Sequence, residues 1–186
     1  MKGMLMSLLL HPDTFFGERM KEPGDLKIPA IIVITGAIIA AVGAYLLSGI
    51  YKGLYLAVAG EGLASMLGLF GAISAFFVFI VIWWVAVSGI FTLLSMAFGG
   101  AGTFRRTLEF TGYGLVPVII GSVISVLISL YYLPMIEVPA ITSIQDPAAV
   151  QRFMSTILED PAFREYTMLS SIISVVFLAW SANLWI

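Results

Sequence analysis

The chain has 186 residues, of which 60% are hydrophobic and 11% charged, and its mean hydropathy is +1.05. Soluble domains carry about 25% charged residues, so this composition excludes an ordinary soluble domain and predicts an integral membrane protein. The sequence has no Cys, which excludes disulfides, thiolate metal sites and thiol chemistry. The net charge of −2 gives no basis for nucleic-acid binding, since that function needs a clustered basic surface.

The amino-terminal segment, residues 1–24, is predicted to lie in the membrane interface. Its apolar run is short, and the sequence His-Pro-Asp follows it where a signal peptide would have a small-residue cleavage site. Asp13 is expected to cap a short amphipathic helix that carries Phe15 and Phe16 on its apolar side. A helix of this kind lies among the lipid headgroups and does not cross the bilayer.

Four apolar runs are each long enough to cross a bilayer as a helix, which takes about 20 residues. The sequence therefore predicts an all-α fold: one domain, a polytopic transmembrane helical bundle with additional interfacial amphipathic helices. Before the second span, the chain up to about Gly71 is expected to form a looser interfacial piece. The predicted spans are residues 28–50, 72–98, 110–133 and 167–186.

Small residues recur every four positions in three of the apolar runs. In lipid, such residues let helices approach closely, because burial of apolar surface no longer drives their association. We therefore expect these faces to pack against other helices, either within the chain or in a homo-oligomer. The three sets are Gly36, Ala40 and Ala44; Gly60, Ala64, Gly68 and Ala72; and Gly121, Ser125 and Ser129.

The longest polar stretch, residues 134–166, is predicted to be an outer loop. Asp146 and Asp160 each precede a proline, a typical signal for the start of a helix. Between them, apolar residues follow the spacing of an amphipathic helix. The amino-terminal segment and the pair Arg105-Arg106 together carry more Lys and Arg than the segments predicted for the other side of the membrane. They are therefore predicted to face the cytoplasm.

A polar joint, Gly99–Pro117, separates the second and third apolar runs. Its sequence, GGAGTFRRTLEFTGYGLVP, predicts a short loop at the membrane surface, and Pro117 is expected to kink the third span. A nucleotide-binding loop would need a preceding strand and a following Lys-Ser/Thr, and neither is present. The two arginines would attract anionic lipid by about 1 kcal/mol each, but a simple positive-inside anchor is the favoured explanation for them. The glycines of the joint are Gly99, Gly100 and Gly102.

Two motifs of this chain resemble those of the Yip domain family, the Ypt- or Rab-interacting membrane proteins, in its short prokaryotic form. One is LLLHPDTFF (Leu8–Phe16), with Pro12 before the paired phenylalanines; the other is the polar joint, with its Gly-Gly-x-Gly-x-Phe turn, Gly-Tyr and proline. Trp180 in a late span also matches. The resemblance implies five spans, whereas this sequence shows four, and the Asp-Leu-Tyr-Gly-Pro motif of eukaryotic members does not occur. The resemblance further implies a helical membrane protein that is linked to trafficking or membrane organisation and has no known catalytic activity.

The sequence predicts no catalytic site, no metal site and no cofactor site. His11 is the single histidine, and no base is placed to activate a serine. The four predicted spans contain no Asp, Glu, Lys, Arg or His, which disfavours a transporter, since carriers usually keep charged groups inside the bundle. Trp83 and Trp84 lie near the middle of their span, where packing is the more common role than ligand binding.

We therefore interpret the chain as a non-enzymatic scaffold that presents its cytoplasmic face to a protein partner or to anionic lipid. A small transporter or channel, and a lipid-handling protein, are the alternatives. Gly112, Tyr113 and Pro117 are expected to shape the third span. The candidate contact residues are Phe15, Phe16, Phe104, Arg105 and Arg106.

Overall fold

The computed structural model describes residues 2–141 and 145–185. Met1 of the predicted interfacial segment, residues 142–144 of the predicted outer loop and Ile186 of the fourth span lie outside them. The described residues form helices and connecting loops without a β-strand, which confirms the predicted all-α fold. In chain order the elements are α1 (Lys2–Leu10), α2 (Pro12–Arg19), α3 (Lys27–Ser48), α4 (Lys52–Val78), the π-helix η1 (Phe79–Ala86), α5 (Val87–Ala97), α6 (Phe104–Gly114), α7 (Val116–Tyr132), the 3-10 helix η2 (Leu133–Met135), α8 (Pro147–Glu159) and α9 (Pro161–Trp185).

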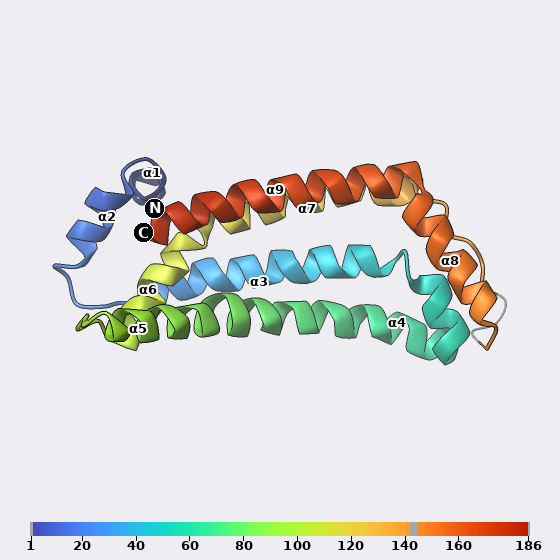
Figure 1. The fold of residues 1–186 in the computed structure, drawn as a ribbon, viewed down its shortest axis with the longest axis horizontal. Coiled ribbons are helices and arrows are strands. Elements are labelled where there is room, and N and C mark those ends of the chain that lie inside the picture. The colour runs from blue at the N-terminus through green and yellow to red at the C-terminus, as the bar shows by residue number, and fades with distance from the viewer. Residues whose placement is uncertain (1, 142–144, 186) are drawn as a thin grey trace.

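The long helices lie side by side and run the length of the molecule (Figure 1). Within the described residues, four helical segments are long and apolar enough to cross a membrane. Their outer surfaces are apolar, with Leu93 68% and Val175 66% exposed. Apolar surface of this extent requires lipid around it. The chain is an integral, multi-pass membrane protein. The four segments are Lys27–Ser48, Gly60–Ala97, Phe104–Met135 and Pro161–Trp185.

The second span begins earlier than the sequence indicates. Its helix continues from Gly60 through α4, η1 and α5 to Ala97, so the part before Gly71 belongs to the same continuous helix. The sharp turn lies at Gly60, where φ is 72°. A residue without Cβ adopts this backbone conformation at little cost.

The polar joint is mostly helical, which contradicts the prediction of a loop across Gly99–Pro117. Only a short connection precedes α6, and both arginines lie in the first turn of that helix. The Thr103 side chain accepts a hydrogen bond from the backbone N–H of Arg106 and so caps the helix. The helix then breaks at Leu115, two residues before Pro117, as expected for a proline that removes a backbone donor.

Small residues allow the long helices to approach one another, as the spacing predicts. A Cβ added to Gly36 would lie 2.7 Å from side-chain atoms of Ile119 and Phe79. A Cβ added to Gly121 would lie 2.9 Å from Phe177 on α9. These positions therefore pack within one chain.

Helix α8 lies across one end of the bundle (Figure 1). Its apolar face, with Phe153 and Ile157, packs on Ile50 and Phe163. Asp146 caps α8 by accepting a hydrogen bond from the Ala148 N–H (3.0 Å), and Asp160 caps α9 through the Phe163 N–H (3.0 Å). The predicted amphipathic helix and both start signals are confirmed.

Helices α1 and α2 lie at the opposite end, beside the N and C labels in Figure 1. Leu8 and Phe15 pack on Tyr113 and Val116 there, which joins the amino-terminal segment to the bundle. The prediction that Asp13 caps α2 is wrong: His11 occupies the cap position and makes no capping hydrogen bond through its side chain. Pro12 begins the helix, and proline at a first position needs no partner for a backbone N–H.

Candidate functional site

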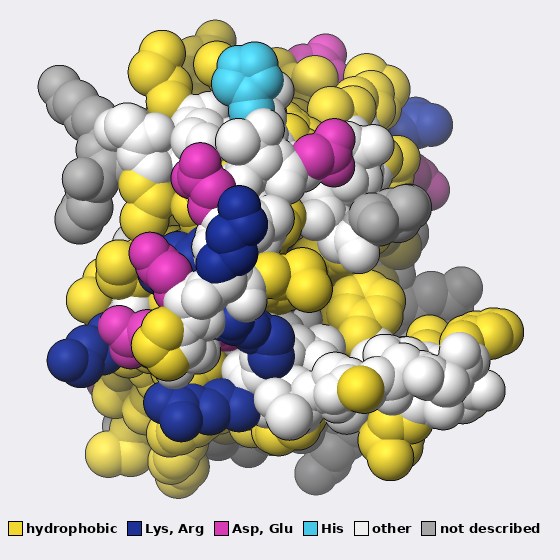
Figure 2. Space-filling model, turned by 90° about the vertical axis from the view of Figure 1, so that its left-hand side faces the viewer, with side chains coloured by type: hydrophobic (Ala, Val, Ile, Leu, Met, Phe, Trp, Pro, Cys, Tyr) yellow, Lys and Arg dark blue, Asp and Glu magenta, His cyan; other side chains and the backbone are white. Residues whose placement is uncertain are grey.

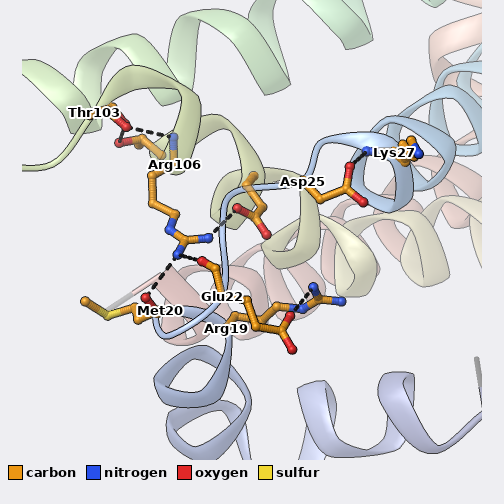
Figure 3. Close-up of polar contacts among 9 residues, drawn as sticks. Arg19, Met20, Glu22, Asp25, Lys27, Thr103 and Arg106 are labelled. Atoms are coloured by element: carbon orange, nitrogen blue, oxygen red, sulfur yellow. Dashed lines mark hydrogen bonds and ion pairs between the residues drawn. The ribbon is translucent and has the colours of Figure 1, made fainter.

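The candidate site lies at the end of the bundle where α1, α2 and α6 meet the end of α9. Acidic and basic side chains are interspersed on this end, with hydrophobic side chains between them (Figure 2). The loop between α2 and α3 crosses it and passes beside α6 (Figure 3). Segments from the two ends of the chain thus meet at one surface.

The centre of this site is an ion pair within α6. Glu109 Oε2 accepts a hydrogen bond from Arg106 Nη1 at 2.7 Å. The Glu109 side chain is fully buried, whereas that of Arg106 is 23% exposed. The Oε1 oxygen of Glu109 is buried and has no hydrogen-bond partner among the described residues. Arg106 is therefore the group that compensates the buried carboxylate.

The same guanidinium ties the α2–α3 loop to the bundle. Arg106 Nη2 donates to the backbone carbonyl of Met20 at 3.1 Å and to that of Glu22 (Figure 3). Next to these contacts, Arg19 forms an ion pair with the Glu22 side chain at 2.9 Å. One side chain of α6 thus holds a loop more than 80 residues away in the sequence.

Aromatic rings form contacts between α2 and α6 at this site. Phe15 meets Tyr113 edge to face at a centroid distance of 5.1 Å, and Phe16 lies 5.1 Å from Phe110. The Arg19 guanidinium lies over the Tyr113 ring at 5.5 Å from its centroid. Such contacts, together with the buried ring area, contribute to the docking of α2 on α6.

Glycines make the close packing at this end feasible. A Cβ at Gly112 would lie 2.7 Å from the Pro29 Cβ and 3.1 Å from Trp84 Nε1. Trp84 Nε1 donates to the Leu108 carbonyl at 2.7 Å, so the indole also ties η1 to α6. A Cβ at Gly114 would overlap the Trp185 indole.

A cavity of about 630 Å³ adjoins the ion pair, between α2, α5, α6 and α9. Its volume lies in the range of small-molecule sites. The lining combines polar groups, including Arg106, Asp13 and Asn183, with aromatic rings such as Phe91 and Phe110. Among the described residues, no group of three His, Cys, Asp or Glu side chains could hold a metal ion.

The candidate contact residues predicted from sequence differ in how far they are exposed. Phe15 is 6% exposed and Arg106 is engaged within the chain, so neither is free to meet a partner. Phe16 is half-buried against Phe110. Phe104 is 44% exposed, and Arg105 is exposed without an ion pair or hydrogen bond to the described residues.

The glycines of the polar joint have structural positions of different kinds. Gly99 has a φ of 78°, which ends α5 with a sharp turn. A Cβ at Gly100 would overlap the Ser95 hydroxyl, and Gly102 lines the cavity beside Arg106. They shape the turn into α6.

Sequence reasoning missed Glu109 and Arg19. The spacing Arg106-x-x-Glu109 is the i, i+3 pattern of a helical ion pair and could have indicated the first. No local pattern indicates that Arg19 lies over Tyr113, because the two residues are distant in the sequence.

The family model of the Yip1 domain matches residues 6–186 of this chain. The uncharacterized protein MJ0794 of Methanocaldococcus jannaschii is 36% identical over 127 residues, which cover 68% of this chain and 89% of that protein. No solved structure matches the chain. The family match covers nearly the whole bundle, including α2, the Arg106–Glu109 pair and α9. The chain belongs to the Yip1 domain family.

Proposed function

We propose that this protein is a non-enzymatic membrane scaffold of the Yip type, which presents the surface around the start of α6 to a protein partner. One observation carries the proposal: at three successive positions, Phe104 and Arg105 point outward while Arg106 is engaged inward. The inward arginine holds the amino-terminal helices in place. The outward pair then sits on a rigid support, as a recognition surface requires.

The charge of this end favours a protein partner over an anionic membrane surface. Anionic lipid attracts clusters of basic residues without acidic neighbours. Here the exposed basic and acidic side chains are balanced, and two further pairs neutralise each other internally. Mixed charge beside an exposed aromatic ring is typical of a protein interface rim. Outside these pairs, the exposed basic residues among the described side chains of this end are Lys21, Lys27 and Arg105, and the exposed acidic residues are Asp13, Glu18 and Asp25.

The arrangement of the reactive groups supports the proposal of a non-enzymatic role. The one buried carboxylate among the described side chains, that of Glu109, is paired with Arg106. His11 is exposed at the start of α2. Among the described residues, the titratable side chains of the site form no nucleophile–base pair. Glu109 lies near the end of its span, and among the described residues no Asp, Glu, Lys, Arg or His lies in the middle of the bundle, which disfavours coupled transport.

The site is proposed to face the cytoplasm. Its end of the molecule carries five basic residues from the described side chains, compared with three at the α8 end. The cytoplasmic side of membrane proteins has the excess of Lys and Arg. The five are Arg19, Lys21, Lys27, Arg105 and Arg106; the three are Lys52, Arg152 and Arg164.

Partner capture in native membranes tests the proposal. A photo-reactive amino acid at position 104 is expected to give defined protein adducts, and Arg105→Ala is expected to reduce their yield several-fold. Arg152→Ala is the matched control, because Arg152 is also exposed, at 72%, but lies at the opposite end. An adduct pattern at position 104 that Arg105→Ala leaves unchanged would refute the proposed surface.

A further inference from the structure

A second cavity, of about 470 Å³, lies inside the membrane-spanning part of the bundle, remote from the Arg106–Glu109 pair. Helices α3 and α9 both pack on α7, and the cavity lies between them, with α7 as its floor. Small residues line this space, including Gly43 and Ala44 of α3 and Gly121 of α7. All of its lining residues are uncharged.

The dimensions of the cavity match one leaflet of a bilayer. Its floor follows α7 from Val118 to Ser129, which is about 16 Å at a helical rise of 1.5 Å per residue. Half of a hydrocarbon core is about 15 Å thick. The lining from η1, Phe79 and Trp83, lies toward the middle of the bundle, and π-helical segments are frequent at functional sites.

Polarity changes along the cavity. Two of its serines donate to carbonyls of their own helix: Ser122 to Val118 (2.9 Å) and Ser129 to Ser125 (2.8 Å). Because these hydroxyl groups are bonded within α7, this part of the cavity wall is effectively apolar. Toward the α8 end, the hydroxyl of Tyr166 lies 3.4 Å from that of Ser129.

A shallower hollow continues from the cavity at Tyr166 and adds further hydroxyl groups of α9. Ser170 Oγ in this hollow is buried and has no hydrogen-bond partner among the described residues. A buried hydroxyl without a partner costs free energy, so a ligand atom that bonds to it would bind favourably. The additional residues of the hollow are Thr167, Ser170 and Ser171.

We propose that this cavity binds one hydrocarbon chain of a membrane lipid from the leaflet at the α8 end. The uncharged oxygen atoms that link chain and headgroup would meet the hydroxyls of Tyr166, Ser170 and Ser174. Because the lining has no charge, the site selects the chain and its linkage and does not discriminate between headgroups by charge. This site is independent of the end surface proposed for partner binding.

Photo-labelling in vesicles tests the proposal. The full chain is reconstituted into phosphatidylcholine that contains a trace of the same lipid with a diazirine in the middle of one chain. After irradiation, adducts are expected on Phe79, Trp83 and Phe177, several-fold above those on the lipid-facing residue Ile73 of α4. Adducts spread evenly over all lipid-facing helices would overturn the proposal, as would an absence of adducts on all three cavity residues.

A variant that fills the cavity sharpens the test. A Cβ at Gly43 would lie 3.5 Å from Val126, an ordinary contact, so Gly43→Leu is expected to occupy the space and reduce adducts at Trp83 several-fold. Gly71→Leu is the matched control, because a Cβ there meets nothing within 4 Å. If Gly43→Leu does not fold, Ser174→Leu serves as the second cavity-filling variant, because Ser174 lines the cavity at an exposed position of α9. An undiminished yield in the folded variant contradicts the site.

The headgroup provides a second readout. Exchange of phosphatidylcholine for phosphatidylglycerol is expected to leave the adduct pattern unchanged, because no charged side chain lines the cavity. Labelling that occurs only in the anionic lipid would contradict the proposed basis of recognition.

Discussion

Replacement of Arg106 by alanine tests whether the buried ion pair holds the amino-terminal helices. The variant removes the partner of Glu109 and both hydrogen bonds to the carbonyls of Met20 and Glu22. Loss of one partner from a buried ion pair costs about 3–5 kcal/mol of unfolding free energy. Because the Arg106 side chain is 23% exposed, water partly replaces it, and we expect a loss near the lower limit, about 3 kcal/mol.

The two partners differ in burial, so their substitutions are expected to differ in effect. Arg106→Ala leaves a fully buried carboxylate without compensation. Glu109→Gln removes the charge, retains an oxygen acceptor and leaves Arg106 in contact with water and with the loop, so we expect it to cost about 1 kcal/mol. The double variant Arg106→Ala/Glu109→Gln is expected to lose about 1–2 kcal/mol less unfolding free energy than the sum of the two single losses.

Unfolding in mixed micelles, with hydrogen exchange of the α2–α3 loop, measures these changes. Arg105→Ala is the matched control, since Arg105 is exposed on the same turn and is expected to change stability by less than about 0.5 kcal/mol. Exchange in residues 20–26 is expected to rise in Arg106→Ala alone. If Arg106→Ala is as stable and as protected in the loop as Arg105→Ala, the ion pair does not hold this end together.

Two further substitutions test the packing. Gly112→Ala places a Cβ 2.7 Å from Pro29 and is expected to lower the unfolding free energy by about 1–3 kcal/mol, whereas Gly71→Ala, in open space, is expected to be neutral or stabilising. Equal stability of the two alanine variants would refute the close contact. Phe153→Ala removes a side chain on the buried face of α8 that is 2% exposed, and it is expected to lower the unfolding free energy by about 3–5 kcal/mol. Leu158→Ala, at a side chain that is 55% exposed, is expected to leave the unfolding free energy almost unchanged. Similar losses for these two, measured by the same unfolding assay, would show that α8 does not pack as described.

The features that could be predicted from sequence depend on neighbouring residues along the chain. Apolar runs of sufficient length predict membrane-spanning helices, and the aspartates before Pro147 and Pro161 predict the starts of α8 and α9. The polar joint is mostly helical and not the predicted loop, because Thr103 caps α6 and the i, i+3 pair after it favours a helix.

The sequence by itself determined that this protein is a helical bundle in a membrane, because hydrophobic length and periodicity are properties of single segments. Only the tertiary structure decided which of two adjacent arginines is free. Arg106 turns inward because the carbonyls of Met20 and Glu22 reach it from a distant loop, while Arg105 meets no such partner among the described residues. The cavity between α3, α7 and α9 likewise depends on how three separate helices cross, and no single segment encodes that arrangement.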